Sequence, residues 1–212
     1  MVLNSIFMLL NTNMRYNILL LLLIGQCIVA HAQKVLIDTE VGSIVIELYA
    51  DKAPGTVANF LRYVDQKRYD GGWFYRVVRL DNQANNPVKI EVIQGGLQND
   101  STRMFPPIPQ ETTQKTDLKH LDGTLSLARG QPNSGASEFF ICINSQPELD
   151  FGGKRNPDGQ GFAAFGRVVS GMDVVRRIQQ SETGSPGPTN AYANPLQLLK
   201  KPIAIRKVER MK

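Results

Sequence analysis

The chain has 212 residues, of which 42% are hydrophobic and 20% charged. This composition is typical of an ordinary globular domain and excludes a disordered or fibrous protein. The formal net charge is +5, but lysines and arginines are interleaved with acidic residues and form no block that would follow a row of phosphates. We therefore expect no nucleic acid among the partners of this chain.

The first 32 residues differ in composition from the rest. Arg15 is their only charged residue, and an almost wholly apolar run covers residues 18–30. The run ends in Ala30-His31-Ala32, a small-x-small pattern that signal peptidases cleave. The sequence thus predicts a signal peptide over residues 1–32, with cleavage after Ala32.

A retained membrane anchor is the alternative for this segment. A spanning helix needs roughly 20 apolar residues, and the run here is shorter and interrupted at Gln26. Lipidation at Cys27 is a further alternative, but a lipoprotein site would have a small residue at the position that Gln26 occupies. We expect an exported protein, periplasmic or secreted, whose mature domain covers residues 33–212 and makes no stable membrane insertion after cleavage.

The mature chain opens with two β-branched runs over residues 35–39 and 43–49, separated by a short turn that contains Gly42. This pattern predicts a β-hairpin. Apolar residues at helical spacing then predict a helix that begins near Ala53-Pro54 and ends near Asp65. A strand over residues 73–79 follows.

Short apolar runs separated by Gly, Pro and Asn continue to the end of the chain. They predict strands over residues 89–94, 124–128, 139–143, 162–169 and 203–208, and a second helix over residues 172–180. Many short strands with two distant helices favour a closed antiparallel β-barrel over a parallel sheet. Three long loops cover residues 80–87, 151–161 and 183–202, and loops of this length are usually functional or mobile.

Cysteine and histidine counts exclude several chemistries. After cleavage, Cys142 and His120 are the only Cys and His left, so we expect no intrachain disulfide, no His or Cys metal site and no cofactor. Ser134, Ser137 and Cys142 are candidate nucleophiles, but each would depend on His120 as its base. No second signal favours such a hydrolase.

A series of short motifs runs in order through the middle of the chain. The motifs are Phe74-Tyr75-Arg76-Val77-Val78, Val92-Ile93-Gln94-Gly95-Gly96, Leu125-Ser126-Leu127-Ala128-Arg129, Pro132-Asn133-Ser134-Gly135-Ala136-Ser137-Glu138-Phe139-Phe140-Ile141, Leu149-Asp150 and Ala164-Phe165-Gly166-Arg167-Val168. In this order they resemble the cyclophilin family of peptidyl-prolyl cis/trans isomerases. The resemblance covers residues 35–208 and implies a mainly β fold, a closed eight-stranded antiparallel barrel capped by two helices.

The same resemblance implies roles for individual residues. Arg76 matches the catalytic arginine of the family, Gln94 the glutamine that orients the substrate, and Phe140 the base of the proline pocket. Further residues would bind the substrate as a strand edge that pairs with the peptide or as apolar walls of the pocket: Phe74, Val92, Ala128, Arg129, Leu149 and Phe162.

An arginine suits this chemistry on physical grounds. Rotation about an X-Pro bond breaks amide resonance, with a barrier of roughly 18 to 20 kcal/mol. A permanently charged guanidinium can donate a hydrogen bond to the prolyl nitrogen as it loses conjugation, an interaction made mainly in the transition state. We expect the chain to act as a monomer on unfolded or flexible proline-containing polypeptides, and to assist their folding.

Two other functions fit parts of the sequence. A proline-peptide-binding module with weak turnover would explain the enlarged loops and Glu91. If the segment is aligned without a gap, Glu91 occupies a position where the family usually has an aromatic pocket residue; the insertion over residues 80–87 leaves this register open, and another residue of that loop is the alternative for the missing wall. A lipocalin-style barrel would need a hollow interior, whereas large residues such as Phe139 and Phe165 are expected to fill this one.

Two further positions depart from the family pattern. Glu138 replaces a common glutamine, and Glu148 stands where some members carry the tryptophan that helps to bind cyclosporin. We therefore expect weak cyclosporin binding.

Overall fold

The structure of the chain is a computed structural model that describes residues 33–84, 86–184 and 194–211. The predicted signal peptide and Cys27 lie outside the described residues, as do residues 185–193 of the third predicted loop. None of the helices in the described ranges is long and apolar enough to cross a membrane.

Within these ranges, eight strands form one closed barrel in the order β1-β2-β7-β5-β6-β4-β3-β8, and all neighbouring strands are antiparallel. This confirms the fold expected from the sequence. The strands are β1 (Gln33–Thr39), β2 (Gly42–Leu48), β3 (Gly72–Val78), β4 (Val92–Gly96), β5 (Thr124–Leu127), β6 (Phe139–Cys142), β7 (Ala163–Ser170) and β8 (Leu198–Arg210).

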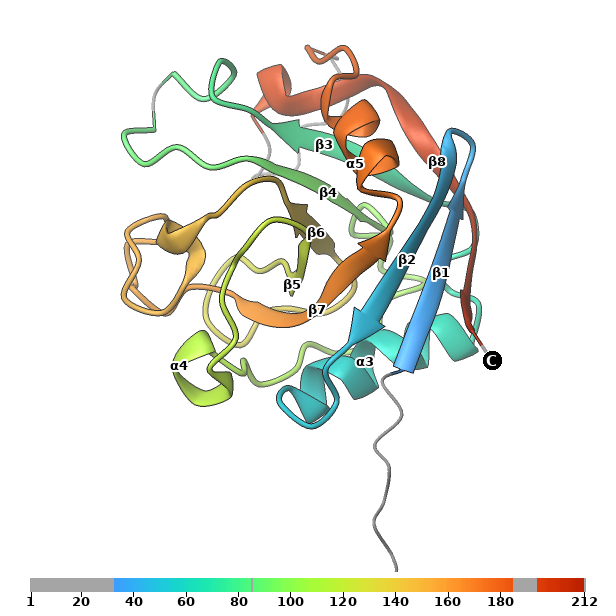
Figure 1. Cartoon of the computed structure of the whole chain (residues 1–212), viewed down its shortest axis with the longest axis horizontal. Helices are drawn as coiled ribbons and strands as arrows, with labels where there is room; N and C mark the ends of the chain where they lie inside the picture. Colours follow the sequence, from blue (N-terminus) through green and yellow to red (C-terminus); the bar gives the residue numbers. More distant parts are fainter. Residues whose placement is uncertain (1–32, 85, 185–193, 212) are drawn as a thin grey trace, which may run out of the picture. The chain divides into compact units, whose positions relative to one another are not determined.

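The two predicted helices are present and cap the barrel. Helix α3 (Pro54–Asp65) crosses one end and α5 (Met172–Gln179) crosses the other (Figure 1). Short helical segments that the sequence did not predict lie in the connections: α4 (Thr113–Thr116), η1 (Pro147–Leu149) and η2 (Pro195–Gln197).

Strand β8 begins five residues earlier than the expected start at Ile203. Pro202 reads as a strand breaker in the sequence, but it lies where β8 bulges away from β3: Phe74 opposes Ile203 and Arg76 opposes Leu198. Proline is tolerated at such a bulge because no ladder hydrogen bond is required there.

Large aromatic side chains fill the barrel interior. Phe60 of α3 packs against Tyr69, Phe139 and Phe165 with ring centroids between 5.2 and 5.7 Å apart, and all four are completely buried. A barrel filled in this way leaves no room for a ligand inside, which argues against the lipocalin-style alternative.

Alternation along β4 and β6 sorts side chains between the interior and the outer wall. Ile93, Phe139 and Ile141 belong to the main core, whereas Val92 and Phe140 belong to a second apolar cluster outside the barrel. That outer cluster is the foundation of the candidate site.

Candidate active site

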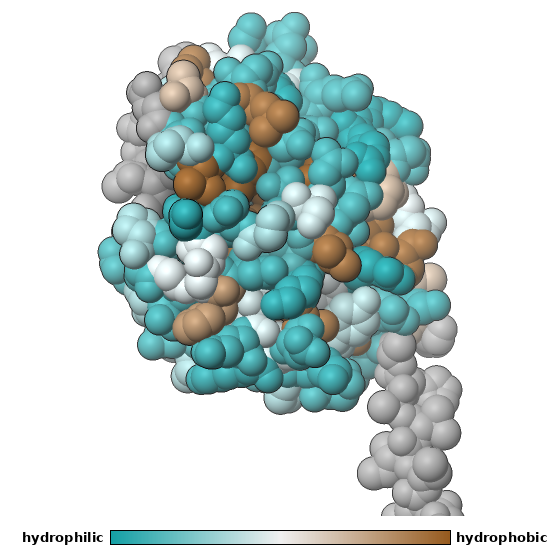
Figure 2. Space-filling view, turned by 60° about the vertical axis from the view of Figure 1, so that its left-hand side comes forward, coloured by the Kyte–Doolittle hydropathy of each residue, from teal (hydrophilic) through white to brown (hydrophobic). Residues whose placement is uncertain are grey.

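A cavity of about 570 Å³ lies against the outer wall of the barrel, over β3, β4 and β6. Figure 2 looks from this side of the molecule and shows hydrophobic side chains gathered within a rim of hydrophilic ones. Eight of the nine residues predicted for the site line this cavity: Arg76, Val92, Gln94, Ala128, Arg129, Phe140, Leu149 and Phe162.

Phe74 is the exception, and its predicted role in substrate binding is wrong. It is completely buried inside the barrel, edge-to-face with Phe139 at a centroid distance of 5.7 Å. The cause is a β-bulge: Phe74 opposes Gly95 and Arg76 opposes Gln94, so that Tyr75 is an extra residue on β3. Without the bulge, Phe74 and Arg76 would face the same side of the sheet.

The floor of the cavity is apolar. Phe140 contacts Phe162 edge-to-face at 5.2 Å, and Val92, Leu149 and Ile90 belong to the same buried cluster. An apolar floor made of these side chains can hold a proline ring away from water.

Glu91 does not enter the cavity. Its carboxylate accepts hydrogen bonds from Asn144 Nδ2 at 2.9 Å and from Gln179 Nε2 of α5 at 3.1 Å, on the other face of the strand. Ile90, which lines the cavity, supplies the apolar wall that Glu91 lacks.

The guanidinium of Arg76 is held by two glutamines. Its Nη1 donates to Gln94 Oε1 at 2.6 Å, and its Nη2 and Nε donate to Gln197 Oε1 at 2.6 and 3.1 Å. One N–H on Nη1 and one on Nη2 are left for a ligand, because a guanidinium carries five N–H donors. No sequence motif points to Gln197, which belongs to η2 at the end of a long loop.

Burial lowers the pKa of Arg76 to about 10; Tyr75 opposes this shift and the charge of Arg155 adds to it. The group is therefore fully charged at neutral pH. No carboxylate in the described residues forms an ion pair with it, so its charge faces the cavity uncompensated by direct contact.

Sequence comparison gives the family to which this arrangement belongs. Residues 34–208 match the model of the family described as cyclophilin type peptidyl-prolyl cis-trans isomerase/CLD. The chain belongs to the cyclophilin family. Peptidyl-prolyl cis-trans isomerase A of Dickeya dadantii is 34% identical over 179 residues, which cover 84% of each chain. Peptidyl-prolyl cis-trans isomerase B of Escherichia coli is 36% identical over 150 residues, which cover 70% of this chain and 85% of the relative.

Solved structures agree on the fold. A cyclophilin type isomerase of Cryptosporidium parvum superposes with a TM-score of 0.61 and 21% identity, covering 86% of this chain and 99% of that one. A second crystal structure of that protein, determined in the presence of the dipeptide Ala-Pro, gives a TM-score of 0.63.

A chain of hydrogen bonds in this cyclophilin connects Arg76 to a buried carboxylate. Gln94 Nε2 donates to Tyr75 Oη at 2.8 Å, and Tyr75 Oη donates to Glu138 Oε2 at 2.7 Å. The other oxygen, Oε1, accepts from Leu97 N and from Ser137 Oγ. Burial and the charge of Glu138 raise the pKa of Tyr75 well above its ordinary value, so the phenol stays a donor.

His120 of this cyclophilin supports the floor from behind. Its ring is stacked on Phe140 at 6.0 Å, and its Nδ1 and Nε2 contact Asp150 Oδ1 at 2.8 Å and Ser126 Oγ at 2.9 Å. The pattern resembles a Ser-His-Asp triad, but Ser126 has no exposed surface and His120 only 1%. A substrate cannot reach this serine, which argues against hydrolysis there.

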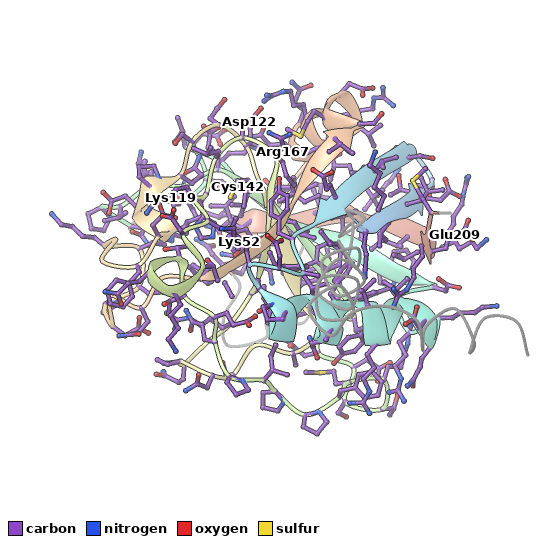
Figure 3. The ribbon with its side chains drawn as sticks, turned by 60° about the horizontal axis from the view of Figure 1, so that its bottom comes forward. Lys52, Lys119, Asp122, Cys142, Arg167 and Glu209 are labelled. Atoms are coloured by element: carbon purple, nitrogen blue, oxygen red, sulfur yellow. The ribbon has the colours of Figure 1, made fainter. Side chains whose placement is uncertain are left out.

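Cys142 lies among the barrel strands, completely buried (Figure 3). Burial raises the pKa of its thiol well above the ordinary value, which disfavours the reactive thiolate. Cys142 therefore acts as a small hydrophobic residue within the same apolar cluster as Phe140 and Val92. No group of three or more His, Cys, Asp or Glu side chains in the described part of the chain could hold a metal ion.

Arg129 of this cyclophilin closes one side of the cavity. Its Nη1 and Nη2 donate to the two carboxylate oxygens of Asp158 at 2.7 and 2.8 Å, and its Nε donates to Gly161 O. The pair fastens the loop over residues 151–161 to the end of β5. Neighbouring Ala128 is only partly buried, which leaves an edge of backbone beside the apolar floor.

Proposed function

We propose that this cyclophilin accelerates rotation about X-Pro bonds in unfolded or flexible polypeptides outside the cytoplasm, and thereby assists the folding of exported proteins. The isomerase activity follows from membership of the family and from relatives that carry this name. The observation that carries the residue assignment is the guanidinium of Arg76, held by two glutamines beside the apolar floor of Phe140.

The proline ring would lie on the floor formed by Phe140, Val92, Leu149 and Phe162. There the N–H groups of Arg76 that the glutamines do not use would donate to the prolyl nitrogen as the amide loses its double-bond character. That hydrogen bond forms mainly in the transition state, so it accelerates the rotation rather than only tightening binding. No proton is transferred and no covalent bond breaks.

Gln94 contributes to positioning in this proposal. Its Oε1 is bonded to Arg76 and its Nε2 to Tyr75, so both ends of the amide already have a partner. One N–H of Nε2 stays available for the substrate carbonyl, the role expected from the family. Gln94 can therefore orient Arg76 through Oε1 and the substrate carbonyl through Nε2 with a single orientation of its side-chain amide.

A binding module with weak turnover receives less support. A charge in the pocket would favour such a module, but the carboxylate of Glu91 is hydrogen-bonded to Asn144 and Gln179 instead. NMR exchange spectroscopy on a short Ala-Pro peptide separates the two functions. We expect accelerated cis/trans exchange with the wild-type protein and its loss with Arg76→Ala; binding without acceleration would show a binding module.

Proline-containing peptides are the proposed substrate class, and a crystal structure of the Cryptosporidium parvum protein was determined in the presence of the dipeptide Ala-Pro.

The proposal of export rests on residues 1–32 and is tested separately. Mass spectrometry of the protein made from the full sequence should give an N-terminus at Gln33. A chain that still begins upstream, or one lipidated at Cys27, would contradict cleavage after Ala32. We propose a monomer, which light scattering would test.

A further inference from the structure

Arg155 lines the cavity together with Ile90, which precedes β4 in the chain by two residues. Its Nη1 donates to Gln83 Oε1 at 3.0 Å and to Val88 O at 2.6 Å, and its backbone N donates to Glu148 O at 3.1 Å. These contacts join two of the long loops and fix the side chain at the cavity wall.

Only part of this guanidinium is used. Both hydrogens on Nη1 have acceptors, whereas Nε and Nη2 have none among the described residues. No carboxylate in the described ranges lies within ion-pair distance of Arg155. The edge formed by Nε and Nη2 is one of the two edges of a guanidinium that can bind a carboxylate with two parallel hydrogen bonds.

Acceptors nearby are already in use. Gln83 Oε1 also accepts from Ile90 N, and Asn86 Oδ1 accepts from Val88 N. Arg129 offers a direct comparison on the same cavity, because its fork is filled by Asp158. Arg155 has the same chemical group without the acidic partner.

The distribution of charge around the cavity also favours a negatively charged ligand. Arg76 and Arg155 both face it without an ion-pair partner in the described residues. Among the described residues that line the wall, Glu138 has the only carboxylate, and it accepts hydrogen bonds from Tyr75, Leu97 and Ser137. A substrate that carries a negative charge would meet an unbalanced positive wall.

We propose that Arg155 is a specificity-determining residue that receives a carboxylate on a residue flanking the proline, so that the preferred substrates carry an acidic group beside the X-Pro bond. This inference rests on the proposed function, because it places the proline on the floor formed by Phe140. The carboxylate can come from an Asp or Glu side chain or from the end of a chain, and peptides distinguish these sources.

The test compares peptides that differ only in charge. C-terminally amidated peptides with Glu before or after the proline are measured against their Gln counterparts, together with a peptide that ends in Pro with a free carboxylate. We expect kcat/KM for at least one acidic peptide to exceed that of its neutral counterpart by about five- to tenfold, as a charge-assisted hydrogen bond implies. The ratio of kcat/KM for the acidic peptide to that for the neutral peptide should fall towards one in Arg155→Gln. In Arg155→Lys it should lie between one and the wild-type ratio.

Arg206→Gln is the matched control, since it removes the same charge from an exposed position on β8 outside the cavity and should leave the ratio unchanged. Raising the salt concentration should lower the wild-type ratio. Equal rates for acidic and neutral peptides, or a ratio that survives Arg155→Gln, would overturn the proposal while the isomerase function stands. If no peptide is accelerated, the proposed function fails, and the ratio of peptide affinities from NMR titration still decides the role of Arg155.

Discussion

Gln197 Oε1 accepts two hydrogen bonds from Arg76, from Nη2 at 2.6 Å and from Nε at 3.1 Å, although the two residues are 121 positions apart. Its own Nε2 donates to the backbone oxygen of Asn82 at 3.2 Å. The amide is thus oriented by one long loop while it orients the guanidinium. Gln197 acts on the reaction through Arg76 and is a positioning residue.

Replacement of Gln197 by alanine should lower kcat by about ten- to hundredfold, because a guanidinium held on one side only samples unproductive orientations. KM should change little, since the apolar floor is intact. Gln197→Glu keeps an acceptor at the same reach and should retain more activity than the alanine variant. Gln180→Ala, at an exposed position, is the control. A variant in which only stability falls, with kcat unchanged, would show a purely structural role.

Removal of the cation itself should have a larger effect. Arg76→Ala should reduce kcat/KM by about a hundred- to a thousandfold, the range seen when a transition-state donor is lost. Arg76→Lys keeps a positive charge, but a lysine ammonium cannot donate to both glutamines as the planar guanidinium does. The activity of this variant should therefore lie between that of the wild type and that of Arg76→Ala. Exchange NMR gives the rates and circular dichroism shows whether each variant folds. Full activity in Arg76→Ala would refute the mechanism.

Activity should be independent of pH across the neutral range and decline only in strong alkali. The pKa of Arg76 is lowered to about 10, so the group loses its charge as pH rises through that value. Between about pH 10 and the ordinary pKa of a guanidinium, the unfolded chain binds a proton that the folded chain lacks. The contribution of this group to stability therefore rises with pH in that window. A profile of kcat/KM from pH 6 to beyond pH 10 tests this, and a step near neutrality would contradict it.

Sequence patterns predicted most of the barrel, because each strand alternates between interior and exterior with a period of two residues. They failed where that period is broken. The extra residue Tyr75 on β3 turns Phe74 inward, and a bulge that includes Pro202 lets β8 begin at Leu198.

The apolar floor and Arg76 could be predicted because family motifs contain them. Gln197, Ile90 and Arg155 could not, because their roles depend on how the long loops fold back onto the barrel wall. Such long-range contacts leave no periodic signal in one sequence.

Tyr75→Phe should lower the free energy of unfolding by about 1 to 3 kcal/mol, since it leaves both Glu138 Oε2 and Gln94 Nε2 without this partner in a buried position. It should also lower kcat, because Gln94 then holds Arg76 less firmly. Urea unfolding and exchange NMR measure the two effects. Tyr49→Phe is the matched control: the phenol of Tyr49 makes no hydrogen bond within the described residues, and its loss should cost little. Equal stability of the two variants would show that the connection to Glu138 contributes nothing.

Cyclosporin should bind weakly, because Glu148 stands where the family resemblance places a tryptophan. Glu148 is partly exposed, and its Oε2 accepts a hydrogen bond from Lys154 N at 2.8 Å, so the position offers a charge in place of an indole ring and its N–H donor. Titration calorimetry on the wild-type protein should show no tight binding, whereas Glu148→Trp should bind at least about tenfold more strongly, as a restored aromatic contact and donor imply. Glu182→Trp, outside the cavity, controls for a nonspecific aromatic effect. Tight binding by the wild-type protein would contradict the prediction and mean that residues lining the cavity replace the tryptophan.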